Sequence, residues 1–401
     1  MKNKNKKWCR FRHKIVFDFL RFICTPLFKI MYNYKSIKYK LNKKQGYFII
    51  SNHQALLDPL FVALSFKKPI YFVATDNLFN QKFVSFWLKW LVNPIPKRKA
   101  TIDATCLKNC LKVAKENGTV GLFVEGNRAY GDFQFYIDPS ISKLVKKMNL
   151  PLILYNLKGG FGVDPRWGKK NRRGKFTGEV KKELSIEEIN NLSNEELHEI
   201  ICEELKVFDS DLNETYKTKD RAEYLERQFF VCPKCGKMET IYSKGNYVCC
   251  SNCDLKVEYT ENLLLKSEDS EFKFTKLVDW YKYQIEYIKD LKINDNKNIF
   301  EDDAVEIYYS NTNQKRTLIT EGKLILNKDH LQINDKIINV CDIIAASPVG
   351  GFKLMLSTND NNYLLKGKER FNPVKYALIF NILDGPIKER GGDKYYGFSV
   401  Y

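Results

Sequence analysis

Short apolar segments alternate with amphipathic helical segments through residues 47–154, and this alternation is the feature that most limits how the chain can fold. The clearest helical pattern spans residues 104–117 and is ended by Gly118. Strands that alternate with helices favour a sheet covered by helices. We therefore predict an α/β fold with a mixed sheet flanked by helices. The expected strands are the apolar runs at residues 47–51, 69–74, 120–124 and 150–154.

Positive charge is concentrated in the first half of the chain. Residues 1–47 contain 14 Lys and Arg against one Asp, and residues 48–178 contain 21 basic against 8 acidic side chains. The whole chain has a net charge of +18, so the remainder is mildly acidic. A basic half of this kind favours an anionic partner, such as a membrane surface, nucleic acid or a phosphorylated substrate.

The apolar segment at residues 15–32 is the candidate for membrane contact. It is interrupted by Pro26 and by three charged side chains. No run of about 18 apolar residues is free of charge, so we expect no ordinary transmembrane helix. We expect instead a helical segment over residues 15–44 that lies in the membrane interface. The alternative is a core helix with a basic outer face.

His53 lies where the first expected strand gives way to a helix, and Asp58 follows five positions later. An imidazole with a pKa of about 6.5 can accept a proton at neutral pH. A carboxylate on the other ring nitrogen fixes the tautomer and stabilises the imidazolium. We predict that His53 is a general base oriented by Asp58. The alternative is that His53 packs locally and Asp58 only caps the helix.

A second motif follows the expected strand at residues 120–124 and reads Glu125-Gly126-Asn127-Arg128. A planar guanidinium binds phosphate oxygens in bidentate fashion. Glycine lets the backbone approach a ligand closely. This turn is therefore a candidate phosphate-binding site.

The two motifs together resemble the first and third sequence blocks of the 1-acylglycerol-3-phosphate acyltransferase family, the glycerolipid acyltransferases, over about residues 15–178. The third block of that family reads Phe-Pro-Glu-Gly-Thr-Arg, and here Val124 and Asn127 replace the Pro and the Thr. The second block of the family ends in an Arg, for which Arg98 is the match. The replacements leave the exact acceptor open.

The resemblance implies a fold, a reaction and a role for each matching residue. It implies a glycerolipid acyltransferase-like sheet flanked by helices. The donor would be acyl-CoA or acyl carrier protein, and the acceptor a lysophospholipid. His53 and Asp58 would be the catalytic pair. The residues that would bind the glycerol phosphate of the acceptor are Glu125, Gly126, Arg128 and Arg98.

Two Cys-x-x-Cys pairs, Cys232 with Cys235 and Cys250 with Cys253, are separated by fourteen residues. Four thiolates with no open coordination position are typical of structural zinc sites. We predict that these four cysteines bind a structural zinc ion in a zinc ribbon. Cys249 is an alternative ligand to its neighbour. Disulfide bonds are a further alternative, which fits less well because we recognise no secretory signal.

The last hundred residues alternate short strand-like runs before a final helix, a pattern that resembles a pleckstrin-homology or GRAM-like domain. We therefore expect six segments. They are a basic amphipathic membrane-associating segment at 1–44, the acyltransferase domain at 45–184, a helical linker at 185–228, the zinc ribbon at 229–260, a second helical linker at 261–302 and the PH/GRAM-like β domain with its terminal helix at 303–401.

The combined prediction is a membrane-associated acyltransferase on the cytoplasmic face of the membrane, peripheral or monotopic. The expected reaction converts 1-acylglycerol-3-phosphate to phosphatidate. One alternative is a catalytically inactive lipid-binding or scaffold protein. Another is a zinc-ribbon protein that binds nucleic acid. Residues 229–260 hold four Lys against three acidic residues. Because the ribbon is nearly neutral, we expect no nucleic-acid partner.

Overall fold

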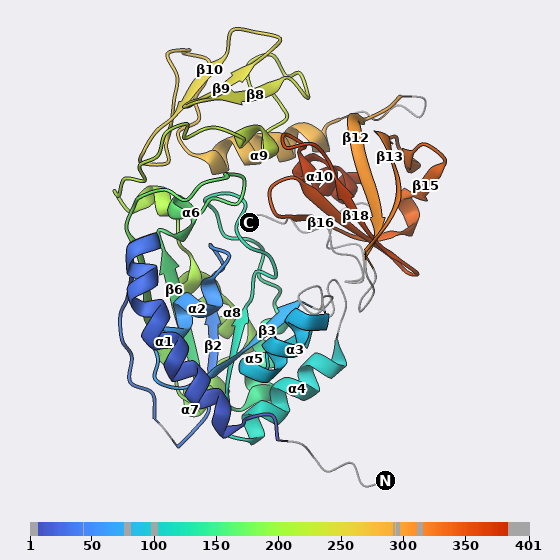
Figure 1. Cartoon of the computed structure of the whole chain (residues 1–401). Coiled ribbons are helices and arrows are strands. Elements are labelled where there is room, and N and C mark those ends of the chain that lie inside the picture. The colour runs from blue at the N-terminus through green and yellow to red at the C-terminus, as the bar shows by residue number, and fades with distance from the viewer. Residues whose placement is uncertain are drawn as a thin grey trace. The chain divides into compact units, whose positions relative to one another are not determined.

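The computed structural model describes residues 7–42, 44–75, 82–97, 103–291, 293, 297–310 and 316–383. These residues divide into two compact units, each built from separate stretches of the chain (Figure 1). The first unit takes its residues from 1–129, 134–164 and 173–214, and the second from 130–133, 165–172 and 215–401.

A mixed sheet of seven described strands forms the centre of the first unit, in the order β1-β7-β6-β2-β5-β3-β4. Neighbouring strands are parallel except for β6 and β7, which are antiparallel. The predicted mixed α/β fold is confirmed, although β1, β4 and β7 were not among the expected strands. The strands are β1 (Tyr34–Ser36), β2 (Phe48–Ser51), β3 (Ile70–Thr75), β4 (Ile95–Lys97), β5 (Thr119–Phe123), β6 (Leu152–Lys158) and β7 (Phe176–Leu184).

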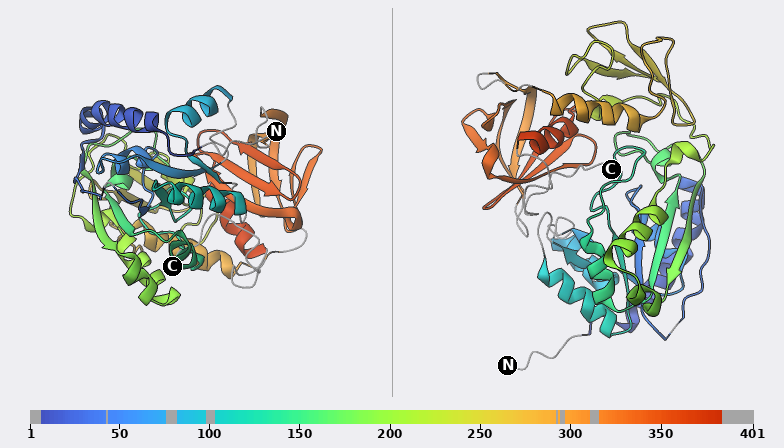
Figure 2. Two further views of the ribbon diagram at one scale, coloured as in Figure 1. Left: turned by 90° about the horizontal axis from the view of Figure 1, so that it is seen from below. Right: turned by 180° about the vertical axis from the view of Figure 1, so that it is seen from behind.

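Helices cover both faces of this sheet (Figures 1 and 2). One hydrophobic core joins α4, α5, α7 and α8 to one face. On the opposite face, Phe61 of α2 packs against Phe28 of α1 and Phe176 of β7, each with a ring separation of 4.7 Å. The helices are α1 (Phe11–Tyr32), α2 (Asp58–Ala63), α3 (Lys82–Leu91), α4 (Ala104–Lys115), α5 (Ser140–Met148), α6 (Gly160–Val163), α7 (Ile186–Asn191), α8 (Asn194–Leu205) and the 3₁₀ helix η2 (Asp209–Asp211).

Helix α1 is shorter than the helical segment predicted for residues 15–44. It continues through Pro26 and ends at Tyr32. Asn33 then adopts a left-handed backbone with a φ of 49°, and β1 pairs with β7. The prediction was wrong beyond residue 32 because a strand of three residues leaves no periodic pattern to recognise. Within the described ranges, no helix combines the length and the apolar character needed to cross a bilayer.

The second unit contains two antiparallel sheets. The smaller has the order β11-β10-β9-β8, and the larger has the order β15-β14-β13-β12-β18-β17-β16. The larger sheet and the helix α10 that follows it confirm the predicted strand-rich C-terminal region. The elements are η3 (Leu225–Arg227), β8 (Ile241–Lys244), β9 (Tyr247–Cys250), β10 (Lys256–Tyr259), β11 (Leu265–Lys266), α9 (Leu277–Lys289), β12 (Phe300–Tyr309), β13 (Thr317–Leu326), β14 (His330–Ile333), β15 (Lys336–Asn339), η4 (Val340–Asp342), β16 (Ile343–Val349), β17 (Lys353–Thr358), β18 (Asn362–Lys366) and α10 (Pro373–Leu383).

Candidate active site

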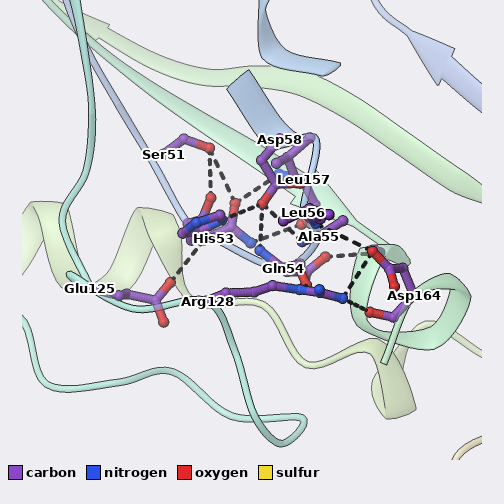
Figure 3. A network of polar contacts seen from close by, with 12 residues as sticks. Ser51, His53, Gln54, Ala55, Leu56, Asp58, Glu125, Arg128, Leu157 and Asp164 are labelled. Atoms are coloured by element: carbon purple, nitrogen blue, oxygen red, sulfur yellow. Dashed lines mark hydrogen bonds and ion pairs between the residues drawn. The ribbon is translucent and has the colours of Figure 1, made fainter. Parts of the chain in front are cut away.

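The candidate site lies at the edge of the first sheet where the adjacent parallel strands β2 and β5 end. Their register pairs Ser51 with Phe123. His53 and Glu125 each follow two residues later, so the two side chains arrive at the same place (Figure 3). The backbone N of His53 donates a hydrogen bond to Glu125 Oε1 at 3.2 Å. The structure therefore brings together the two motifs that the sequence singled out.

A buried carboxylate holds the imidazole of His53. The Nδ1 atom of His53 lies 2.8 Å from Asp58 Oδ2, and Asp58 is fully buried whereas His53 keeps 22 % of its side-chain surface exposed. The same carboxylate oxygen accepts hydrogen bonds from the backbone N of Gln54 at 2.6 Å and of Ala55 at 2.9 Å. Because Nδ1 faces Asp58, the geometry leaves Nε2 for a substrate hydroxyl.

Asp58 does more than begin a helix. It occupies the first position of α2, and Leu57 is the N-cap residue. The Asp58 carboxylate turns back toward the loop and accepts from Gln54 and Ala55, so the alternative of a simple helix cap does not describe it. Three donors converge on one of its oxygens and fix the orientation of His53.

Two aromatic rings support the imidazole from one side. His53 stacks on Phe123 with a ring separation of 4.4 Å and an interplanar angle of 26°. Phe123 in turn stacks on Phe72 at 5.5 Å and 9°. This wall limits the positions that the imidazole ring can take.

The carboxylate of Glu125 accepts hydrogen bonds from backbone amides. Its two carboxylate oxygens accept hydrogen bonds from the backbone N of His53 at 3.2 Å and of Phe135 at 3.1 Å. Burial raises the pKa of Glu125 to about 7, although both backbone hydrogen bonds act to lower it. Gly126 adopts a φ of 65°, in the left-handed region that favours glycine. In this structure Glu125 fixes the loop around His53, and its contact with an acceptor stays a prediction.

Arg128 is paired with a residue that the sequence did not suggest. Its Nη2 lies 2.9 Å from Asp164 Oδ2 and also donates to the backbone O of Asp164. Its Nε donates to the backbone O of Gln54 at 2.9 Å. The Arg128 side chain is 15 % exposed, so a phosphate that binds here shares the guanidinium with Asp164. Arg98, the other predicted cation, lies outside the described residues.

Three further residues of this site were missed by sequence reasoning. Asn52 accepts from the backbone N of Leu157 and donates to its backbone O, both at 2.8 Å, and so ties the His53 loop to β6. Its place beside His53 was the one available signal. Asp164 and Asp209 had no such signal in the sequence, because they follow α6 and α8 rather than a recognised motif.

The loop at residues 166–175 holds six Lys and Arg side chains, a composition that favours contact with an anion. Arg166 instead donates to the backbone O of Pro348 at 2.5 Å and lies 4.2 Å from the ring centre of Tyr130. Arg172 is buried and donates to the backbone O of Arg221 at 2.8 Å. Both guanidinium groups therefore serve the packing of the second unit.

The four predicted metal ligands form one cluster in the second unit. The Sγ atoms of Cys232, Cys235, Cys250 and Cys253 all lie within 4.8 Å of one another. The separation is 3.7 Å between Cys232 and Cys253 and 3.8 Å between Cys235 and Cys250. Thiolates that bind a tetrahedral zinc ion at about 2.3 Å lie about 3.8 Å apart, whereas disulfide sulfurs lie about 2.05 Å apart. The cluster fits zinc and includes Cys250 rather than Cys249.

The chain is similar to known acyltransferases. Residues 34–154 match the family model described as Acyltransferase. A 1-acyl-sn-glycerol-3-phosphate acyltransferase from Borreliella burgdorferi is 31% identical over 123 residues, which are 30% of this chain and 49% of that protein. This chain thus spans about half the length of the curated relative that it matches.

A solved structure was also found. It is the crystal structure of the 1-acyl-sn-glycerophosphate acyltransferase from Thermotoga maritima, with 17% identity and a TM-score of 0.41 over 48% of this chain and 77% of that one. The family match contains His53, Asp58 and residues 125–128. The predicted resemblance is confirmed, and residues 34–154 carry an acyltransferase-family domain.

The raised pKa of Glu125 predicts a pH dependence of stability. The pKa rises from 4.5 to about 7 on folding. The stabilising contribution is therefore complete below about pH 4.5 and is lost as the pH rises toward 7, by about 3 kcal/mol in total. Urea unfolding of wild type and Glu125→Gln across this range should show the wild type losing stability relative to the variant. A difference that stays constant with pH would contradict the assignment.

Proposed function

Because residues 34–154 carry an acyltransferase-family domain, we propose that this chain transfers a fatty acyl group to the free hydroxyl of a lysophospholipid. The proposed acceptor is 1-acylglycerol-3-phosphate, which gives phosphatidate, and the donor is acyl-CoA or acyl carrier protein. The observation that carries the proposal is the 2.8 Å contact between His53 Nδ1 and the buried carboxylate of Asp58.

In the proposed reaction, His53 Nε2 takes the proton of the acceptor hydroxyl as the hydroxyl oxygen attacks the thioester carbonyl carbon. The carbon–sulfur bond then breaks, and the departing thiolate recovers the proton from the imidazolium. Asp58 stabilises the imidazolium and keeps Nε2 directed at the acceptor. No covalent intermediate on the protein is needed, because a thioester is reactive enough for direct attack.

The acceptor phosphate is assigned to the turn at residues 125–128. Arg128 supplies a planar guanidinium, and Gly126 leaves room for close backbone approach. We assign Arg98 as a second cation for the same phosphate. The contact of Arg128 with Asp164 supports this role, because the pair keeps the guanidinium in place before the phosphate arrives.

We propose that helices α1 and α3 place the enzyme on the cytoplasmic face of an anionic membrane, as a peripheral or monotopic protein. Phe22 and Ile30 of α1 are 80% and 82% exposed, and Trp87 of α3 is 42% exposed. The guanidinium of Arg12 lies 5.2 Å from the ring centre of Trp90 and joins the two helices. Exposed apolar side chains beside basic ones suit the interface of a membrane with anionic lipids.

We also propose that the four-cysteine cluster holds a structural zinc ion. The supporting observation is the match between its sulfur separations and a tetrahedral site. Four thiolates leave no open position, so the ion would stabilise the ribbon and take no part in acyl transfer.

The catalytic assignment predicts that His53→Ala lowers kcat/KM for 1-acylglycerol-3-phosphate (lysophosphatidate) by about 10²–10⁴-fold. The measurement is acyl transfer from acyl-CoA and from acyl carrier protein to a panel of lysophospholipids. His330→Ala, on β14 of the second unit, is the matched control and should keep wild-type activity. Full activity of a folded His53→Ala variant would remove the basis for the proposed function.

The membrane assignment predicts that Phe22→Gln with Ile30→Gln weakens binding to vesicles of phosphatidylglycerol and phosphatidylcholine. Each exposed side chain contributes about 1.5–3 kcal/mol when it is fully buried in an apolar phase, so the pair should reduce vesicle binding at least about tenfold. Tyr242→Gln, an exposed aromatic of the ribbon, is the control. Sedimentation with vesicles measures the effect, and equal binding by both variants would exclude α1 as the contact.

The zinc assignment predicts one zinc ion per chain by elemental analysis of purified protein. Cys250→Ser should lose this ion, and Cys249→Ser should retain it, because Cys250 is the member of the cluster. Two neighbouring cysteines thus provide a matched pair of variants. Zinc loss in both variants, or in neither, would contradict the assigned ligand set.

A further inference from the structure

Gln54, the residue after His53, connects the parts of the candidate site. Its backbone N donates to Asp58 at 2.6 Å and its backbone O accepts from Arg128 at 2.9 Å. One residue therefore joins the catalytic pair to the guanidinium. Its buried side chain also makes two hydrogen bonds, from Gly160 N to Oε1 at 2.9 Å and from Nε2 to Asp209 at 3.2 Å.

Asp209 holds the start of α6 beside Gln54. It comes from η2 and is 1% exposed. Its carboxylate accepts hydrogen bonds from the backbone N of Gly159 at 2.7 Å and of Gly162 at 2.9 Å, in addition to the one from Gln54. A buried carboxylate that accepts several backbone hydrogen bonds fixes the local chain strongly, because each lost bond leaves a polar group unsatisfied.

Helix α6 approaches Gln54 so closely that a side chain at position 160 would clash with it. A Cβ atom added to Gly160 would lie 2.9 Å from both Cβ and Oε1 of Gln54. Asp164 is the C-cap residue of α6. Its carboxylate pairs with Arg128 at 2.9 Å and accepts from the backbone N of Leu56 at 3.3 Å. The position of Asp164, and through it that of Arg128, thus depends on how α6 is held.

We propose that Asp209 and Gln54 are positioning residues that set the place of Arg128 for the acceptor phosphate. They act through α6 and Asp164 and touch neither the substrate nor the proton in transfer. Asp209 lies beyond residue 154, where the family match ends, so the working part of the site extends into the segment after α8. This inference rests on the proposed function, because it assigns the phosphate of the acceptor to Arg128.

Loss of the Asp209 contacts should affect binding of the acceptor and leave the chemical step unchanged. In Asp209→Asn the side chain keeps its size but can no longer accept all three hydrogen bonds. Arg128 would lose its fixed position while His53 and Asp58 keep theirs, since their contact does not pass through α6. Binding of a phosphorylated acceptor should weaken, whereas proton transfer at His53 should continue.

The test compares lysophosphatidate with 1-acylglycerol, which lacks the phosphate, in mixed micelles with acyl-CoA as donor. For Asp209→Asn we expect KM for lysophosphatidate to rise about tenfold, the factor for one lost hydrogen bond to a charged group. The kcat value, its pH profile and transfer to 1-acylglycerol should stay close to wild type. Asp211→Asn is the control, because it makes the same change in the same short helix at an exposed residue.

Gln54→Met provides a second approach to the same contact, with thermal unfolding measured for every variant. Gln54→Met should raise KM for lysophosphatidate as Asp209→Asn does. The double variant should raise KM no further than the more severely affected single variant does, because both changes break the same connection. Additive losses, or equal losses with both acceptors, would overturn the positioning role.

The outcomes separate this inference from the proposed function. Wild type that acylates neither acceptor would overturn the proposed function, and the positioning role with it. Active wild type together with an Asp209→Asn variant that behaves like Asp211→Asn would overturn the positioning role alone.

Discussion

The parallel pairing of β2 with β5 is the constraint on which the site depends. Parallel neighbours end at the same edge of a sheet, so a register that sets Ser51 opposite Phe123 delivers the next residues of both strands to one place. A shift of one residue in this register would turn every side chain of β2 to the other face. The apolar packing on both faces of the sheet therefore helps to fix the distance between His53 and Glu125.

Backbone amides hold the three buried carboxylates around this edge. Asp58, Glu125 and Asp209 each accept two backbone hydrogen bonds. The donors lie in the His53 loop, at Phe135 and at the start of α6. A backbone N–H has no rotamers to lose, so it orients a carboxylate at a low entropic cost. Arg128 is held differently, through the side-chain carboxylate of Asp164, and that contact is open to competition from another anion.

The sequence predicted the central strands and the two motifs of the candidate site because each has a local signal. The runs before His53 and Glu125 are apolar, and the motifs follow where the strands end. The partners of Arg128 and Gln54 were not predictable, because Asp164 and Asp209 come from segments that are distant in the sequence and carry no recognised motif. The helix predicted to residue 44 failed for a related reason, since pairing with β7 determines β1.

The second unit includes residues 130–133 and 165–172, which lie inside the chain of the first unit. Tyr130 donates from its hydroxyl to the backbone O of Gly350 at 2.6 Å, across 220 residues of sequence, and Trp167 is 1% exposed. During synthesis these two segments are made well before the rest of the second unit, which begins at residue 215. The ribbon and the β domain are therefore not a module that could be transplanted, because part of their core is encoded within the acyltransferase-family domain and just after it.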